Sequence, residues 1–292
     1  QVYQQEPDDA TDRLSGMVVT YDASIDRVWM GLSETMSKRL GIAWFDMSDR
    51  EAPVLLGTEL DDRDVRAVSA EGGRLLVGTN GEAYLLNEAV EKVATIDSIS
   101  ASYGVALRGD RALIADETML RLFDVSDVGS PVELDSLQMS ARGWDVEFDG
   151  RRVAVVLGSA GVGLFEVVDD VLRQTGAVAL PSSAFDAALD GDDLWIAAWT
   201  GTWLVDVRSE TPVTLGESPS VSRSVGVGAG YGRAMVGEVF FGRALQRVPR
   251  AGGAELTMTA ALYFPDTEEG VPQLLEVRND GSLAMEVEFE CN

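Results

Sequence analysis

Carboxylates at equivalent positions of two neighbouring segments are the residues best suited to chemistry. Asp145 follows Trp144 and Asp186 follows Phe185, each at the start of a segment of similar sequence. Glu147 lies two residues beyond Asp145, which places both on one face of a strand. These acids could form an acid–base pair if burial raised one pKa, and Asp145 and Asp186 could hold Ca²⁺, which prefers oxygen ligands. The alternative is that they accept hydrogen bonds from neighbouring backbone or serine groups.

Aromatic residues and arginines form a second group with chemical potential. Three successive segments begin with an aromatic side chain, and arginines lie in the predicted loops that precede segments of this kind. Aromatic rings beside arginines could stack a sugar, a peptide or an aromatic ligand, whereas the alternative is that they pack between structural repeats. The predicted ligand-binding residues are Arg63, Tyr103, Arg142, Trp144, Phe185 and Arg223.

Composition excludes several classes of function. The formal net charge is −26, which repels nucleic acid and anionic membranes. Histidine is absent and Cys291 is the only cysteine, so a histidine-based triad, an intrachain disulfide and a multi-thiolate metal site are excluded. No apolar stretch approaches the roughly 18 residues of a membrane-spanning helix, so we expect no membrane insertion. The first residue is Gln1, as expected after removal of a signal peptide or trimming of the chain.

An internal repeat of about 40 residues positions these side chains. Each copy starts with a strand, a tight turn and a second strand, and the turns at Asp149-Gly150 and Asp190-Gly191 are strong hairpin signals. The copies begin near Gly16, Val65, Tyr103, Trp144, Phe185 and Ser224.

The second half of the repeat predicts two further strands. Segments ending at Asp46 to Asp49, Asp124 to Asp127 and Asp206 to Ser209 read as a third strand followed by an Asp-rich turn. A proline then opens a short fourth strand, where its missing N–H breaks no strand pairing. Four short strands per repeat predict an all-β fold, a β-propeller of about six four-stranded blades, with seven blades left open.

The segments Ile42 to Asp49, Leu120 to Asp127 and Trp203 to Ser209 resemble the LVIVD repeat of bacterial and archaeal surface proteins. That resemblance implies propeller blades and a secreted, periplasmic or cell-surface protein, and it carries no catalytic residues. We therefore expect a propeller over residues 1–261. Residues 262–292 either close the propeller with a hairpin or resemble the start of an Ig-like choice-of-anchor module, in which case further domains follow Asn292.

Two functions remain at this point. The first is a non-catalytic binding module whose ligand, a protein, peptide or glycan, sits at the mouth of the propeller channel, with no cofactor. The second is a carboxylate-dependent hydrolase or lyase, with or without Ca²⁺, that uses Asp145, Glu147 and Asp186. The missing histidine and cysteine chemistry favours the first.

Overall fold

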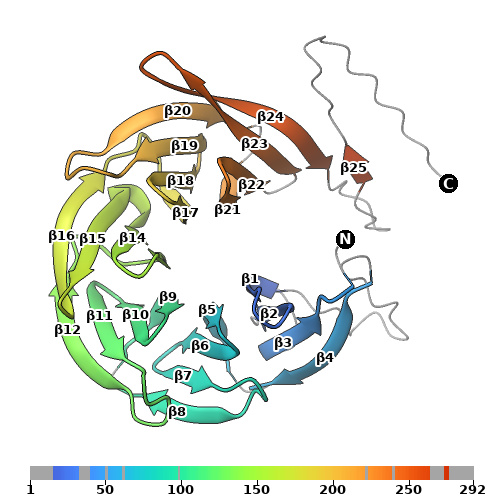
Figure 1. Cartoon of the computed structure of the whole chain (residues 1–292), viewed down its shortest axis with the longest axis vertical. Helices are drawn as coiled ribbons and strands as arrows, with labels where there is room; N and C mark the ends of the chain where they lie inside the picture. The colour runs from blue at the N-terminus through green and yellow to red at the C-terminus, as the bar shows by residue number, and fades with distance from the viewer. Residues whose placement is uncertain are drawn as a thin grey trace. The chain divides into compact units, whose positions relative to one another are not determined.

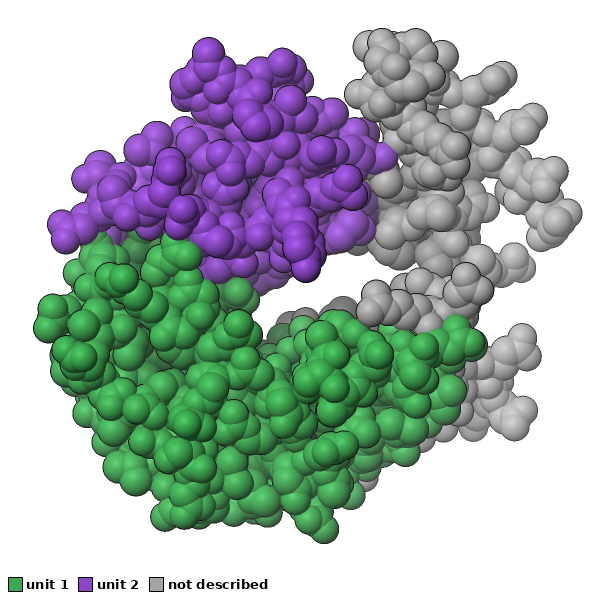
Figure 2. All heavy atoms as spheres, in the orientation of Figure 1, with its two compact units in different colours: residues 1–158, 163–175 green, residues 159–162, 176–292 purple. Residues whose placement is uncertain are grey.

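The structure is a computed structural model that describes residues 16–32, 40–49, 52–60, 63–97, 99–220, 223–238, 241–263 and 273–275. These residues form six antiparallel sheets and no α-helix, which confirms the prediction of an all-β fold. Within each sheet, strands that are consecutive in sequence are hydrogen-bonded neighbours (Figure 1). The chain divides into two compact units, residues 1–158 with 163–175, and residues 159–162 with 176–292 (Figure 2).

The first unit contains three complete sheets and most of a fourth. The first sheet comprises β1 (Gly16–Asp22), β2 (Arg27–Leu32), β3 (Gly41–Asp46) and β4 (Val54–Glu59). The second comprises β5 (Val65–Glu71), β6 (Arg74–Thr79), β7 (Ala83–Leu86) and β8 (Lys92–Ile96). The third comprises β9 (Ser102–Arg108), β10 (Arg111–Asp116), β11 (Met119–Asp124) and β12 (Val132–Gln138). The fourth comprises β13 (Asp145–Phe148), β14 (Arg152–Val156), β15 (Val162–Val168) and β16 (Val171–Val178).

The second unit contains the fifth and sixth sheets. The fifth comprises β17 (Ala184–Asp190), β18 (Asp193–Ala198), β19 (Gly201–Asp206) and β20 (Val213–Pro219). The sixth comprises β21 (Ser224–Gly230), β22 (Arg233–Glu238), β23 (Phe241–Arg250), β24 (Gly253–Tyr263) and β25 (Gln273–Leu275). Because β24 extends to Tyr263 and β25 pairs with it, five described residues of the predicted tail belong to the sixth sheet: Leu262, Tyr263 and Gln273–Leu275. The rest of the predicted tail hairpin and Cys291 lie outside the described residues.

Each sheet starts within one residue of a predicted repeat start, so the repeat is confirmed as the structural unit. The predicted Asp-rich turns are also confirmed, because Asp46, Asp124 and Asp206 each accept a hydrogen bond from the backbone N–H two residues on. The hydrogen bonds of Ser126 hold the pKa of Asp124 below its usual value. Asn87 replaces the aspartate in the second sheet, and its Oδ1 accepts the equivalent hydrogen bond from Ala89 N–H at 3.0 Å.

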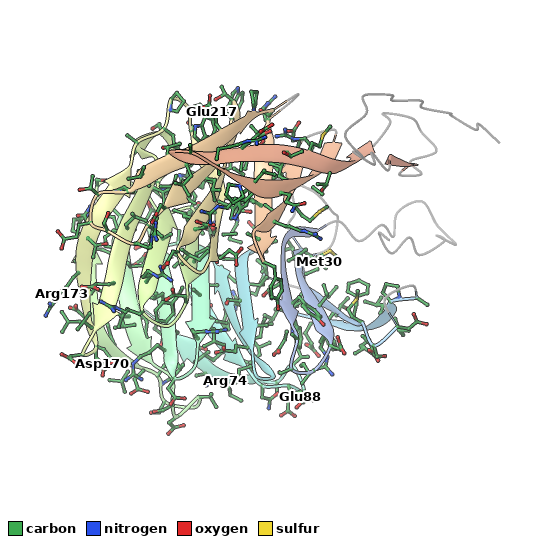
Figure 3. The ribbon with its side chains drawn as sticks, turned by 45° about the horizontal axis from the view of Figure 1, so that its top comes forward. Met30, Arg74, Glu88, Asp170, Arg173 and Glu217 are labelled. Carbon is green, nitrogen blue, oxygen red and sulfur yellow. The ribbon has the colours of Figure 1, made fainter. Side chains whose placement is uncertain are left out.

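Burial explains the sequence pattern of the strands. The second strand of the fifth sheet is covered on both faces, since every residue of β18 is buried, whereas β22 in the sixth sheet alternates between exposed and buried residues. In the first five sheets the fourth strand lies at the edge, where Arg173 on β16 and Glu217 on β20 carry exposed charges (Figure 3). The apolar core lies between adjacent sheets, as where Leu76 of the second sheet packs with Ile114 of the third. A blade is therefore stable only beside its neighbour.

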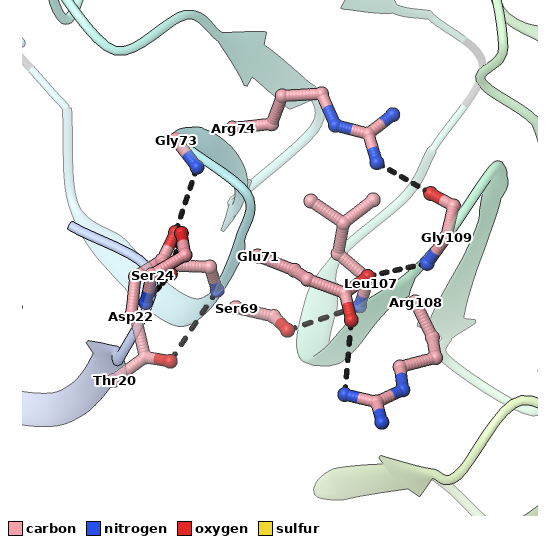
Figure 4. A network of polar contacts seen from close by, with 11 residues as sticks. Thr20, Asp22, Ser24, Ser69, Glu71, Gly73, Arg74, Leu107, Arg108 and Gly109 are labelled. Carbon is pink, nitrogen blue, oxygen red and sulfur yellow. Dashed lines mark hydrogen bonds and ion pairs between the residues drawn. The ribbon is translucent and has the colours of Figure 1, made fainter.

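Polar side chains bind adjacent sheets at their first strands (Figure 4). Asp22, the last residue of β1, accepts the N–H of Gly73 in the second sheet at 2.7 Å. Glu71, the last residue of β5, accepts the N–H of Gly109 in the third sheet. In the second unit, Asp190 at the end of β17 accepts the N–H of Gly232 at 2.6 Å. We call this recurring bond the carboxylate latch.

Each latch depends on a turn glycine. Gly73, Gly109 and Gly232 have φ values of +74°, +55° and +71°, which side-chain-bearing residues rarely adopt. Hydroxyl groups add a second bond at two junctions, where Thr20 Oγ1 accepts Ala70 N–H at 3.3 Å and Ser69 Oγ accepts Leu107 N–H at 2.9 Å. The latch therefore combines a strand-end acid with a left-handed turn in the next sheet.

We predict that Asp22→Ala lowers the free energy of unfolding by about 1–3 kcal/mol, because buried N–H groups lose their acceptor. Burial raises the pKa of Asp22, but hydrogen bonds from Ser24 and Gly73 outweigh it and leave the pKa below 3.8. The wild-type advantage is therefore complete above about pH 4 and disappears as the pH falls through the folded-state pKa. Urea unfolding of both proteins across this range measures it.

Asp97→Ala is the matched control, because Asp97 is exposed and the substitution removes the same charge. An equal change of stability in both variants, at every pH, would show that the latch contributes nothing beyond the effect of removing one carboxylate.

Candidate functional site

A stacked group of aromatic and charged side chains lies at one end of the third and fourth sheets. The rings of Tyr103 and Trp144 have centroids 5.2 Å apart at an angle of 52°. The Arg142 guanidinium lies 5.3 Å from the Tyr103 centroid and 5.6 Å from the Trp144 centroid. Trp144 is 45% exposed, so it is not sealed between sheets. We call Tyr103, Arg142, Trp144 and Glu117 the Trp144 cluster.

Backbone geometry places the members of the Trp144 cluster. Tyr103 is the second residue of β9, and Trp144 precedes β13 and donates its N–H to Val156 O at 2.8 Å. Glu117 occupies the turn after β10 with φ +54°, and its carbonyl accepts Gly143 N–H at 2.9 Å. A Cβ on Gly143 would lie 2.6 Å from Ala115 Cβ, so only glycine allows this close passage of the loop.

Hydrogen bonds hold Arg142 in place. Its Nε and Nη2 atoms donate to one oxygen of Glu117 at 2.9 and 2.6 Å. A second arginine, Arg66 of β5, lies 5.6 Å from the Tyr103 centroid and is ion-paired with Asp64. The cluster is therefore preorganised, since its arginine is fixed before any ligand arrives.

A second stack of the same kind lies within the fifth and sixth sheets. Phe185 and Trp199 have ring centroids 5.7 Å apart, and the Arg223 guanidinium lies 4.2 Å from the Trp199 centroid. Trp199 is 46% exposed. Hydroxyl groups border it, because Ser182 Oγ and Thr200 Oγ1 are 3.0 Å apart and Ser220 Oγ donates to Trp199 O at 3.4 Å. We call Phe185, Trp199, Arg223 and these hydroxyls the Trp199 cluster.

Five of the six predicted ligand-binding residues therefore fall into two stacks, one in each unit. The sixth, Arg63, contacts other partners: its guanidinium lies 5.9 Å from the Tyr84 centroid and 3.8 Å from Glu82. Sequence reasoning missed Glu117 and did not assign Trp199, although both directly follow the second strand of their sheet. A large or charged residue directly after the second strand was the feature of the sequence that could have identified them as site residues.

The predicted catalytic acids have structural contacts. Asp186 Oδ1 accepts Ala187 N–H at 2.9 Å and its Oδ2 accepts Val227 N–H of the sixth sheet at 2.7 Å, as the alternative interpretation expected. Asp145 and Glu147 lie half-buried on β13 in the other unit. Among the described residues, no group of three or more acids or other ligands is placed to hold a metal ion. Calcium binding at Asp145 and Asp186 stays a prediction, which titration of chelator-treated protein with Ca²⁺ would test.

A buried ion pair joins the fifth and sixth sheets. Glu238 ends β22, Arg243 lies on β23, and the two residues are each 5% exposed with Nε and Oε1 2.6 Å apart. Arg243 Nη1 also donates to Ser218 Oγ at 3.1 Å and to Pro219 O at 2.9 Å in β20. Burial lowers the pKa of Arg243, and Glu238 opposes that shift.

The same repeat position is filled differently in other sheets. In the third sheet Asp116 and Arg121 form an ion pair at 3.0 Å with the same spacing of five residues. In the fifth sheet the equivalent positions hold Ala198 and Trp203, both buried. An acid with an arginine and an alanine with a tryptophan thus fill one structural position, in line with the general equivalence of buried ion pairs and well-packed apolar side chains.

We predict that Arg243→Ala destabilises the fold by about 3–5 kcal/mol, because Glu238 would remain buried without its cation. The double variant Glu238→Ala/Arg243→Trp, which copies the fifth sheet, should recover most of that loss. Guanidinium unfolding measures both.

Arg250→Ala serves as the control, since Arg250 forms an exposed pair with Glu255 on the same sheet and should cost less than about 1 kcal/mol. A double variant no more stable than Arg243→Ala would contradict the proposed equivalence.

Comparison with known proteins identifies the architecture. No family model and no curated protein matches the chain, so the LVIVD resemblance stays a prediction. A chain in the crystal structure of the mitotic checkpoint complex is similar over 95% of this chain and 96% of its own, with a TM-score of 0.69 and 12% identity. A protein from Lactobacillus plantarum is similar over 83% of both chains, with a TM-score of 0.70 and 15% identity.

These neighbours establish the fold as a β-propeller, as the repeat predicted. In all, 1267 solved chains match, so the likeness identifies a widespread architecture and not a particular activity. No helix long and apolar enough to cross a membrane occurs in the part of the chain that the structure describes.

Proposed function

We propose that the chain is a non-catalytic binding module that engages a protein, peptide or glycan through the Trp144 and Trp199 clusters. The observation that carries this proposal is the pair of exposed tryptophans, each stacked against an arginine and a second aromatic ring. Large aromatic side chains left in solvent lose the free energy of burial, which binding recovers. Aromatic and arginine side chains also dominate the energetics of binding surfaces.

Preorganisation supports a recognition role for the Trp144 cluster. Because Glu117 fixes Arg142 and the Trp144 backbone pairs with β14, a ligand would meet a surface that needs little ordering on binding. Each side chain that is already ordered removes about 0.5–1.5 kcal/mol from the entropic cost of association. The Trp144 cluster therefore resembles the rigid anchors of specific binding sites.

The histidine and cysteine content of the chain supports the hypothesis of a non-catalytic function. The whole sequence contains no histidine, and its one cysteine is Cys291. The alternative hydrolase or lyase needs Asp186 as a catalytic acid. Both carboxylate oxygens of Asp186 instead accept backbone N–H groups, which is a structural role. We propose a secreted, periplasmic or cell-surface location, supported by the LVIVD resemblance.

Binding by the whole chain is the direct test. Immobilised protein should select ligands from a random-peptide library, a panel of extracellular proteins or a printed glycan array. Trp144→Ala or Trp199→Ala should weaken the selected ligand about tenfold, which corresponds to the stacking energy of one aromatic ring. Calorimetry of the purified variants measures the change.

Tyr231→Ala provides the matched control, because Tyr231 is a fully exposed aromatic residue in the turn between β21 and β22, at the opposite end of β21 from Arg223. Ligands that bind all three variants with wild-type affinity, or the absence of any ligand from all three libraries, would reject the proposal.

A further inference from the structure

The chemistry of the two clusters selects among the ligand classes. Resting on the proposed function, we infer that each cluster binds a neutral glycan built from pyranose rings with equatorial substituents. The flat C–H face of such a ring would stack on the part of Trp144 or Trp199 that the arginine and the second aromatic ring leave exposed, which is 45% and 46% of the two residues. Its hydroxyls would bind the polar groups around the tryptophan. Three features of the clusters support this class over charged or purely apolar ligands.

A cationic ligand would have to compete with the chain's own arginines. Cation–π recognition requires a ring face within about 6 Å that the ligand's cation can occupy. The Arg223 guanidinium already lies 4.2 Å from the Trp199 centroid, and Arg142 lies within 5.6 Å of both rings of the Trp144 cluster. The chain's own arginines therefore already occupy the positions in which a ligand's cation would be attracted to these rings.

An anionic ligand is also disfavoured. Arg142 is neutralised by Glu117 at 2.6 Å, and Arg66 is ion-paired with Asp64. Beyond these pairs, the chain as a whole carries a net charge of −26, which repels anions at long range. The Trp144 cluster consequently offers charged hydrogen-bonding groups without a net positive charge, whereas at the Trp199 cluster, which includes Arg223, the long-range repulsion of the acidic chain is what disfavours an anion.

The polar surroundings match hydroxyl-rich ligands. A guanidinium paired with a carboxylate presents N–H donors beside oxygen acceptors, and each hydroxyl of a sugar both donates and accepts. At Trp199 the neighbours are the hydroxyls of Ser182, Thr200 and Ser220, which have the same dual capacity. Sites that bind small ligands commonly combine an aromatic surface with a few placed polar groups in this way.

Each cluster is complete within its own compact unit, which makes a prediction about stoichiometry. Tyr103, Arg142 and Trp144 belong to the first unit, whereas Trp199 and Arg223 belong to the second. A short neutral oligosaccharide should therefore bind at two sites per chain. Trp144→Ala and Trp199→Ala should each remove one site and leave the other.

The experiment is calorimetric titration of the full chain with four hexasaccharide probes. Two are neutral, cellohexaose and N-acetylchitohexaose; one is cationic, the deacetylated glucosamine hexamer; and one is anionic, a galacturonate hexamer. We expect a neutral probe to bind at two sites per chain, with an affinity that stays within about twofold between roughly 0.05 and 0.5 M NaCl, because no net charge is neutralised. Trp144→Ala and Trp199→Ala should halve the stoichiometry, and Tyr231→Ala should not.

The outcomes separate this inference from the proposed function. Binding of only a charged probe, with an affinity that falls steeply with salt, would overturn the neutral-glycan assignment. Binding of a library peptide or protein that depends on Trp144 or Trp199, with no binding of either neutral probe, would overturn the glycan class and leave the proposed function standing. Neutral-probe binding that neither tryptophan substitution alters would reject the clusters as the site, and no ligand of any kind would reject both.

Discussion

The first strand of each sheet has one backbone edge with no strand beside it, and the N–H groups on that edge require acceptors. Side chains from the first strand of the preceding sheet supply them, as Ser69 does for Leu107 within β9, and Asp22 in the same way supplies an acceptor for Gly73 in the turn after β5. Apolar side chains of neighbouring first strands, such as Ala67 of β5 and Leu107 of β9, lie in one buried cluster between the sheets. Between β9 and β13 a glycine permits the close approach of the two strands, because a Cβ on Gly104 would lie 2.7 Å from the backbone of Asp145.

This need for acceptors also bears on why the side chains of the Trp144 and Trp199 clusters remain available to a ligand. Acids at the ends of first strands act as acceptors for backbone groups, as Asp190 does for Gly232. Near the opposite end, where a first strand begins, Asp186 of β17 also accepts the N–H of Val227, whereas Tyr103 and Trp144 occupy this end in the third and fourth sheets. The residues at this end therefore differ in kind from one sheet to the next.

Much of the architecture was predictable from the sequence, because its signals are local. Turn glycines and Asp-rich turns set the strand boundaries, and all six sheets begin within one residue of the predicted starts. The stacking partners were harder to predict, since Glu117 reaches Arg142 across 25 residues and Phe185 reaches Trp199 across a hairpin. The carboxylate latch was not foreseen, because a strand-end aspartate looks the same whether it bonds its own turn, as Asp149 does, or the next sheet.

The latch has a consequence for the environments in which this acidic chain is stable. Its bonds are short contacts between a carboxylate and a backbone N–H, partly shielded from solvent, and dissolved ions weaken such contacts little. The mutual repulsion of the excess surface carboxylates, in contrast, is long-ranged and is screened by dissolved ions. Added salt is therefore expected to reduce the repulsion between surface carboxylates while leaving the bonds between sheets intact, which would raise the stability of the folded chain.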